Sequence, residues 1–330
     1  DILYYSSLLG ALDSLSYGVT AVFDHHASMN LDRGSLSIEA EAMLHAGIRA
    51  ILCLETSDRR GQKAMMRQVE ENVSFWEQHR KNPFLAGMFG LHANITLSAE
   101  TLSFISRSKP KEMPIHAHCG EASVDLDFCR AEGFAGPVDR FSSFGLIDGD
   151  SFLIHCVHLG EEDYRILKET GAVVVLNPES NANNRVGLPG RERLPGHILG
   201  TDGMTGDILS ALRSYYLLGE GNKEPFPRME DMMFRRPAKI LSRRLPGVFG
   251  FHPGAAADIA VLDYVPLSPI RESNLLGHLL FGAKGGRAYL TAVNGRILWM
   301  KGEFPEHDIL TLRREAQRSA RKLANRFQSR

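Results

Sequence analysis

The segment Pro114–Glu121, with the sequence PIHAHCGE, decides how this chain is interpreted. Side chains alternate along a β-strand, so His116 and His118 face the same side of a strand that ends near Cys119. If that side is the inside of a barrel, two imidazoles point into it, and Glu121 lies just past the strand end. An imidazole is a natural zinc ligand, and a carboxylate about one turn away can shuttle a proton. Taken alone, the pattern also fits histidines that merely pack or form hydrogen bonds.

Short apolar or β-branched runs alternate with helical patterns over the first 245 residues. The expected strands are Thr20–Asp24, Ala50–Glu55, Leu85–His92, Ile115–Cys119, Phe152–Cys156, Ala172–Asn177 and Ile198–Asp202. The expected helices include Ser37–His45, Gln62–His79 and Glu161–Gly171. This alternation predicts parallel βαβ units, seven of them, without the Gly-rich first turn typical of a doubly wound sheet. We therefore predict an α/β fold, a (β/α)8 TIM-type barrel that lacks its first strand.

Beyond Leu245 the pattern changes to β-structure. The run Ala255–Asp263 predicts a strand, and Ala288–Val293 and Arg296–Met300 flank Asn-Gly, a strong two-residue hairpin signal. We predict a barrel over residues 1–246, a small β-rich domain of the composite-sandwich kind over 247–303, and a C-terminal helix over 304–330. That helix is basic and amphipathic, which favours a solvated cap over a membrane anchor.

The composition narrows the functional class. Lys and Arg number 38 against 39 Asp and Glu, a balance that gives no reason to expect nucleic acid or an anionic membrane as partner. The four cysteines form no CxxC pair, which suits a reducing cytosol and argues against disulfides and cysteine redox chemistry. No apolar run approaches the roughly 18 residues of a membrane span. We expect a cytoplasmic protein that acts on a small molecule, and homo-oligomerisation stays open.

Two further signals lie at the ends of later predicted strands. In Ile154–Leu159, IHCVHL, the two histidines are three residues apart and would face opposite ways on a strand. His155, at the strand end, is the better candidate for the site, and we expect His158 to be structural. Asp202, in the sequence LGTDG, is placed to bind a metal or accept a proton from water, or else to form an Asx turn or helix cap.

Earlier strands end in histidine as well. His92 ends the third predicted strand and is a candidate for substrate contact, while His25 and His26 follow Asp24 at the end of the first. Each of these fits a strand-end hydrogen bond equally well. Their conjunction is more informative than any member, because polar groups recur at successive strand ends in the order His92, His118 with Glu121, His155, Asp202. The pattern indicates a metal site at the carboxyl end of a barrel.

These motifs resemble the amidohydrolase superfamily, and within it the chlorohydrolase and nucleobase/adenosine-deaminase branch. The matching motifs are HxxE at 118–121, IHCVHL at 154–159, NPESN at 177–181 and LGTDG at 199–203. DHHAS at 24–28, ETSDRRG at 55–61 and NPESNANNRVG at 177–187 are similar to the SsnA aminohydrolases of that branch. The resemblance runs over essentially all 330 residues, including the AAADIAVLDY strand of the family's small domain. It is specific for the branch and much less so for the substrate.

The resemblance implies one divalent metal ion, Zn²⁺ or Fe²⁺. His118 and Asp202 match its ligands, with Asp202 also taking the proton of the attacking water. His155 matches the histidine that orients this water, and we count it with the candidate ligands. The implied reaction is hydrolysis of a non-peptide C–N bond, in which the activated water attacks a ring carbon bearing an exocyclic amine and ammonia is released.

The resemblance also assigns residues around the metal. Glu121 matches the carboxyl group that protonates the ring nitrogen, and His92 matches the residue that holds the substrate. Asn177 and Asn181 are expected to shape the surroundings of the site. Leu176 departs from the family pattern, because many relatives have a polar residue or histidine there.

A second departure concerns the start of the chain. Relatives carry a further HxH at the end of the first barrel strand, where it supplies two metal ligands. No such motif precedes the helix expected at Ile2–Leu15. The missing motif and the missing βα unit fall at the same place, so we expect a chain truncated upstream, with little or no deaminase activity alone.

Two other functions remain open. The same scaffold can displace chloride or hydrolyse an amidine or ring amide, and the sequence offers no discriminator. The chain can also be read as a non-catalytic binding subunit that keeps a damaged site. An upstream strand ending in HxH would favour the enzyme, and its absence would favour the binding subunit.

Overall fold

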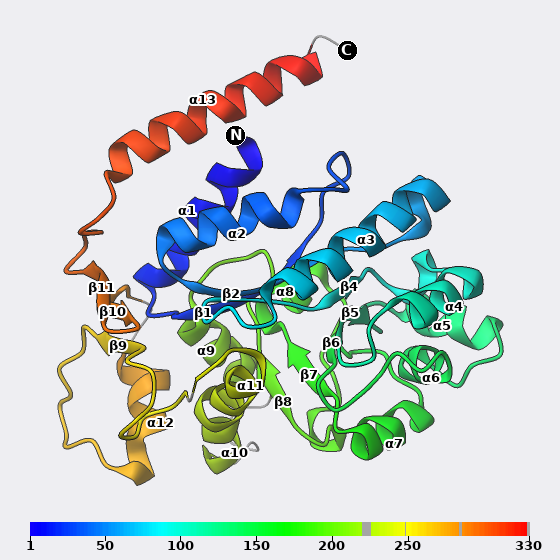
Figure 1. The fold of residues 1–330 in the computed structure, drawn as a ribbon. Coiled ribbons are helices and arrows are strands. Elements are labelled where there is room, and N and C mark those ends of the chain that lie inside the picture. The colour runs from blue at the N-terminus through cyan, green and yellow to red at the C-terminus, as the bar shows by residue number, and fades with distance from the viewer. Residues whose placement is uncertain (220–225, 248, 284–285, 329–330) are drawn as a thin grey trace.

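The computed structural model describes residues 1–219, 226–247, 249–283 and 286–328, and Figure 1 shows their arrangement. The strands are β1 Ala21–His26, β2 Arg49–Leu54, β3 Leu85–Gly87, β4 Phe89–Leu91, β5 Ile115–Cys119, β6 Phe152–His155, β7 Val173–Leu176, β8 His197–Leu199, β9 Ile259–Leu262, β10 Ala288–Val293 and β11 Arg296–Met300. The α-helices are α1 Ile2–Ser16, α2 Ser35–Ala46, α3 Gln62–His79, α4 Ala99–Ser108, α5 Ser123–Ala131, α6 Pro137–Ser143, α7 Glu161–Thr170, α8 Pro178–Asn184, α9 Ile208–Leu218, α10 Phe226–Glu230, α11 Arg236–Arg244, α12 Leu275–Gly277 and α13 Ile309–Gln328.

The first eight strands form the parallel wall of the predicted barrel. β1, β2 and β3 pair in that order, and β4 to β8 continue in chain order. Only Met88 separates β3 from β4, so the single strand predicted over Leu85–His92 is present as two short pieces. Among the described residues, β1 and β3 are the outer strands of the first sheet and β4 and β8 are those of the second, so each of these four pairs on one side only. The parallel strands agree with the predicted α/β fold of the TIM-barrel kind, and the absence of its first strand stays a prediction.

Apolar side chains on both faces of this wall explain its stability. Ile51, Phe152, Ile154 and Val175 pack together in one buried cluster, whereas the alternate residues of β6 and β7 pack in a second cluster and those of β2 in a third. Figure 1 shows those helices arranged around the strands. Burying apolar area on both faces stabilises parallel strands, which is why their sequences are almost continuously apolar.

The register of the strands aligns their carboxyl ends. His118 lies opposite Ile154, Cys119 opposite His155, and Leu176 opposite Leu199. Consecutive strands therefore end at one edge, where the polar residues that follow them meet.

The strand predicted over Ile198–Asp202 stops early. β8 ends at Leu199, and Asp202 has a left-handed backbone with φ +52°. Asp202 therefore lies three residues beyond the strand rather than at its end.

The second sheet is small and antiparallel, in the order β11-β10-β9. The predicted hairpin is confirmed: Asn294 and Gly295 both have positive φ, +52° and +80°, as a type I′ turn requires. The strand predicted over Ala255–Asp263 is shorter, because the N–H of Asp258 bonds the carbonyl of Ala256 in a turn and β9 begins only at Ile259. Helix α12 lies in the same part of the chain, and the sandwich and the domain boundaries stay predictions.

The C-terminal helix α13 runs beside α1, as Figure 1 shows. Ile309 and Leu312 pack against the apolar cluster that α1 helps to form, and Lys322 lies 3.8 Å from Asp1. These contacts agree with a capping helix. No helix among the described residues combines the length and apolar character needed to cross a bilayer.

A buried ion pair joins the small sheet to the barrel. Arg49 of β2 donates from Nε and Nη2 to the carboxylate of Asp258, at 2.8 and 3.0 Å, and both side chains are less than a tenth exposed. Asp258 also accepts the N–H of Asn294 in the hairpin turn. One carboxylate thus connects a barrel strand with the β10–β11 turn.

We predict that Asp258→Asn lowers the free energy of unfolding by about 3 kcal/mol, because it leaves the buried guanidinium of Arg49 without its counter-charge. Urea unfolding followed by circular dichroism measures the change. The same substitution at exposed Asp263 is the control and should change stability by less than about 0.5 kcal/mol. Equal stability of the two variants would contradict the tethering role.

Candidate metal centre and active site

Five polar residues predicted from the sequence converge at the carboxyl edge of the strands. His118 is the second-to-last residue of β5, His155 ends β6, and His92 follows β4 directly. Glu121 and Asp202 come from the loops after β5 and β8. Side chains that follow or end β4, β5, β6 and β8 thus lie at one edge of the strands.

Distances show how closely they meet. The Nε2 atom of His155 lies 3.7 Å from Oε2 of Glu121 and 3.9 Å from Oδ2 of Asp202. The His118 ring stacks on that of His155, with centroids 5.8 Å apart, and lies 5.6 Å from the ring of His92. The structure therefore brings all five side chains together.

His155 is held in one orientation by its neighbours. Its ring is buried, its backbone has φ +73°, and its Nδ1 lies 2.8 Å from Oδ1 of Asn181. Because an amide oxygen only accepts, Nδ1 carries the proton and donates it. The lone pair of Nε2 then points toward the two carboxylates of Glu121 and Asp202. A left-handed histidine costs of order 1–3 kcal/mol, a cost found where a side chain must be aimed.

His118 has the tautomer of a metal ligand. Its Nδ1 lies 3.0 Å from the backbone carbonyl oxygen of His92, which can only accept. The Nδ1–H donates there and leaves Nε2 with a free lone pair, the arrangement by which ligating histidines are oriented. Burial and neighbouring His155 lower the pKa of His118, so the ring is neutral and ready to ligate near pH 7.

Asp202 is ionised at neutral pH. Burial by itself would raise its pKa, but hydrogen bonds from the Ser180 hydroxyl, at 2.6 Å, and the Gly203 N–H, at 2.7 Å, outweigh it and lower the pKa. His155 and His118 act in the same direction. An ionised carboxylate can ligate a cation or take a proton from water.

Glu121 is the most accessible of these groups. About a third of its side chain is exposed, and its Oε1 accepts a hydrogen bond from the Asn184 amide at 3.2 Å. A carboxyl group in this position can exchange protons with both a bound molecule and solvent. This partial exposure to solvent fits the proton-shuttle role expected from the HxxE motif.

Sequence reasoning missed Glu55, which follows β2 as the other site residues follow their strands. Its Oε2 lies 3.9 Å from Nε2 of His92, and Arg59 forms an ion pair with it. Burial raises the pKa of Glu55, although Arg59 opposes the rise. Burial, Arg59 and His118 lower the pKa of His92 to about 4. In the sequence, Glu55 ends the strand predicted over Ala50–Glu55 and begins the ETSDRRG motif, and this position is the signal that could have identified it.

His25 also enters the site. One donor atom each from His25, Glu55 and His118 lie within 4.8 Å of one another, and a second such group joins His25 with Cys53 and His116. The predicted ligand set of His118, His155 and Asp202 is spread more widely and is not among these compact groups. Imidazole and carboxylate donors in this number suit a divalent ion, and the assignment of individual ligands stays a prediction.

The remaining candidates from the sequence, His158 and Asn177, hold the loops around the site. The Nε2 of His158 lies 2.8 Å from the Val186 carbonyl, which agrees with a structural role. Asn177 is buried, and its side-chain oxygen lies so close to Gly200 that any Cβ there would overlap it. The glycine of LGTDG is thus needed for the approach of the two loops.

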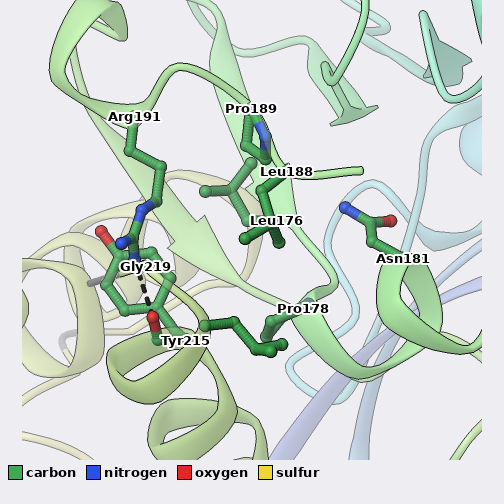
Figure 2. A pocket seen from close by; sticks show the side chains of 9 residues that line it. Leu176, Pro178, Asn181, Leu188, Pro189, Arg191, Tyr215 and Gly219 are labelled. Carbon is green, nitrogen blue, oxygen red and sulfur yellow. Dashed lines mark hydrogen bonds between the residues drawn. The ribbon is translucent and has the colours of Figure 1, made fainter. Parts of the chain in front are cut away.

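An apolar hollow lies behind the site, between β7 and α9 (Figure 2). Leu176, Pro178 and Leu188 line it, and the Arg191 guanidinium donates to the Tyr215 carbonyl along its floor. Asn181 borders the same hollow and holds His155, so it separates the hollow from the polar site. Leu176, which departs from the family pattern, faces this hollow.

Comparison with known proteins identifies the family of the chain. A family model described as the amidohydrolase family matches residues 1–298. The chain is 26% identical over 338 residues to a 5-methylthioadenosine/S-adenosylhomocysteine deaminase of Pelotomaculum thermopropionicum, a match that covers 98% of this chain and 76% of that protein.

Two solved structures share the fold. An adenosine deaminase from Xanthomonas campestris with bound zinc superposes with a TM-score of 0.84 at 18% identity, over 98% of this chain and 75% of that one. The atrazine chlorohydrolase TrzN from Arthrobacter aurescens TC1, complexed with zinc, gives 0.80 at 20% identity, over 96% and 76%.

The buried histidines make stability depend on pH. Burial, with His118 and His155, lowers the pKa of His116 to about 3, so the unfolded chain binds a proton below about pH 6.5 that the folded chain does not. Stability is therefore lost as pH falls, by about 1.4 kcal/mol per pH unit for this one group. We predict that His116→Asn reduces the slope of unfolding free energy between about pH 6 and pH 5, measured by urea unfolding. An unchanged slope would contradict a neutral His116.

Proposed function

The chain belongs to the amidohydrolase family, and from this premise we propose that it is a metal-dependent aminohydrolase that deaminates an amino-substituted heterocycle of the purine or pyrimidine kind. The deaminase name of its sequence relative supports this reaction. The observation that carries the proposal is the position of His155, whose Nε2 faces the carboxylates of Glu121 and Asp202 at 3.7 and 3.9 Å.

His118 and Asp202 would hold the metal ion, for which we propose Zn²⁺, and His155 lies close enough to add a ligand or orient a water. When bound, such an ion lowers the pKa of water toward about 7. The fit rests on two features of this chain: His118 offers a free Nε2, and Asp202 is ionised. Glu55 and His25 supply further donors beside His118.

The proton transfers follow from the environments of the two carboxylates. Asp202, held ionised by its hydrogen bonds, takes the proton of the attacking water. Glu121, partly open to solvent, protonates the ring nitrogen next to the carbon under attack, and the resulting carboxylate then moves the remaining proton of the added hydroxyl to the departing amine. The Nε2 lone pair of His155 accepts a hydrogen bond from the attacking water and orients it, and His92 contacts the heterocycle. Acid–base groups of this kind contribute about 10²–10⁴-fold each.

The proposed location is the cytoplasm, where the buried cysteines Cys53, Cys119, Cys129 and Cys156 would stay reduced. All four are free thiols in the structure. A small-molecule substrate is consistent with the deaminase name of the sequence relative.

We predict that Glu121→Gln lowers kcat for deamination by at least about 10²-fold and changes KM little, because the amide cannot donate an acidic proton. The assay measures ammonia release by the zinc-loaded natural gene product from aminopurines, aminopyrimidines and, as the dechlorination alternative, chlorotriazines. Exposed Glu132→Gln is the matched control and should retain full activity. Normal turnover by Glu121→Gln would exclude the assigned role.

We also predict that Asn181→Leu, nearly isosteric, lowers kcat by about 10–100-fold, since His155 loses the acceptor that fixes its tautomer. Because the effect acts through the imidazole, the acidic limb of the pH–rate profile should shift as well. Asn181→Asp, which keeps an acceptor, should restore much of the activity. A loss of activity in both variants, with an unshifted profile, would indicate a packing role only.

A further inference from the structure

The outer face of β1 carries a second set of potential ligands. His25 points into the barrel, so its neighbours Asp24 and His26 point to the opposite side of the strand. There they meet Glu39 of helix α2, which interacts directly with Asp24. None of these three residues takes part in the proposed catalytic chemistry.

The donor atoms are close together and poorly satisfied. One atom each from Asp24, His26 and Glu39 lie within 4.8 Å of one another. The Glu39 side chain is almost fully buried, and its Oε2 has no hydrogen-bond partner. The Nε2 of His26 is likewise buried without a partner. Buried polar atoms without partners are costly, and several at one point indicate a missing ligand.

The charge around the group is negative. Among the described residues, no arginine or lysine forms an ion pair with Asp24 or Glu39. The carboxylate of Glu71 also acts on His26, while accepting the backbone N–H groups of Gly34 and Leu36. Burial and Asp24 raise the pKa of Glu39 well above its ordinary value, as expected for a carboxyl lacking a counter-charge.

Burial also lowers the pKa of His26, although Asp24 and Glu71 oppose the shift. A divalent cation would supply the missing positive charge and would satisfy the free atoms of Glu39 and His26 together.

We propose that Asp24, His26 and Glu39 bind a divalent transition-metal ion, with Zn²⁺ as the probe, at a structural site between β1 and α2. Two carboxylate oxygens and one imidazole nitrogen are a donor set that zinc accepts. Asp24 and His26 are only partly buried, so water can complete the coordination shell. The ion ties helix α2 to a strand that pairs on one side only among the described residues.

The site is tested by zinc stoichiometry and thermal stability. Glu39→Gln keeps the shape of the side chain and removes the carboxyl group that would bind the ion, so it should fold at least as well as the parent in EDTA. In Zn²⁺ the parent should gain several degrees in Tm, as expected for a ligand well above its Kd, and Glu39→Gln should lose that gain together with one bound ion per chain. His26→Gln should behave in the same way.

Two controls separate this site from others. Exposed Glu41→Gln, the same change on the same helix, should keep both the ion and the gain in Tm. A His118→Ala/Asp202→Asn parent removes the candidate catalytic centre, and Glu39→Gln should still cost one ion there. The proposal is overturned if Glu39→Gln retains the full zinc content and Tm gain of its parent, or if the His118→Ala/Asp202→Asn parent binds no zinc.

Discussion

The alternation of side chains along parallel strands with aligned carboxyl ends is the constraint on which the rest of this molecule depends. It sends His116 and His118 inward from β5, and the pairing of β5 with β6 sets Cys119 opposite His155. The residues just past the strands then meet at one edge, because the strands end side by side. The same alternation sends Asp24 and His26 outward while His25 faces the barrel, so one strand contributes donors to two separate places.

Burial determines what these donors can do. Histidines inside the wall are kept neutral, which makes their nitrogens available as ligands, whereas Asp202 is kept ionised by two short hydrogen bonds. His155 and Asp202 both adopt left-handed backbones, so local strain is used to aim the two groups at each other. Neutral imidazoles beside an ionised carboxylate are the combination that a hydrolytic metal site needs.

Much of the fold and site could be predicted because the signals are local. The β5 strand, helix α3 and the β10–β11 hairpin have the predicted bounds, since alternation, helical periodicity and Asn-Gly are each readable in one segment. The end of β8 was not predictable, because it depends on the backbone of Asp202. The position of Glu55 at a strand end is readable in the sequence, whereas its contact with His92 and the place of Glu39 beside β1 arise from long-range packing, which one sequence does not reveal.

The central claim, that this barrel edge holds a catalytic metal, is tested most directly by anomalous diffraction at the zinc edge from crystals of the natural gene product. The account predicts a peak bounded by His118, His155 and Asp202, with nitrogen and oxygen neighbours at about 2.0–2.2 Å. Well-ordered crystals grown with zinc that show no peak at this edge, or a zinc ion bound only by Cys53 and its neighbours, would contradict it.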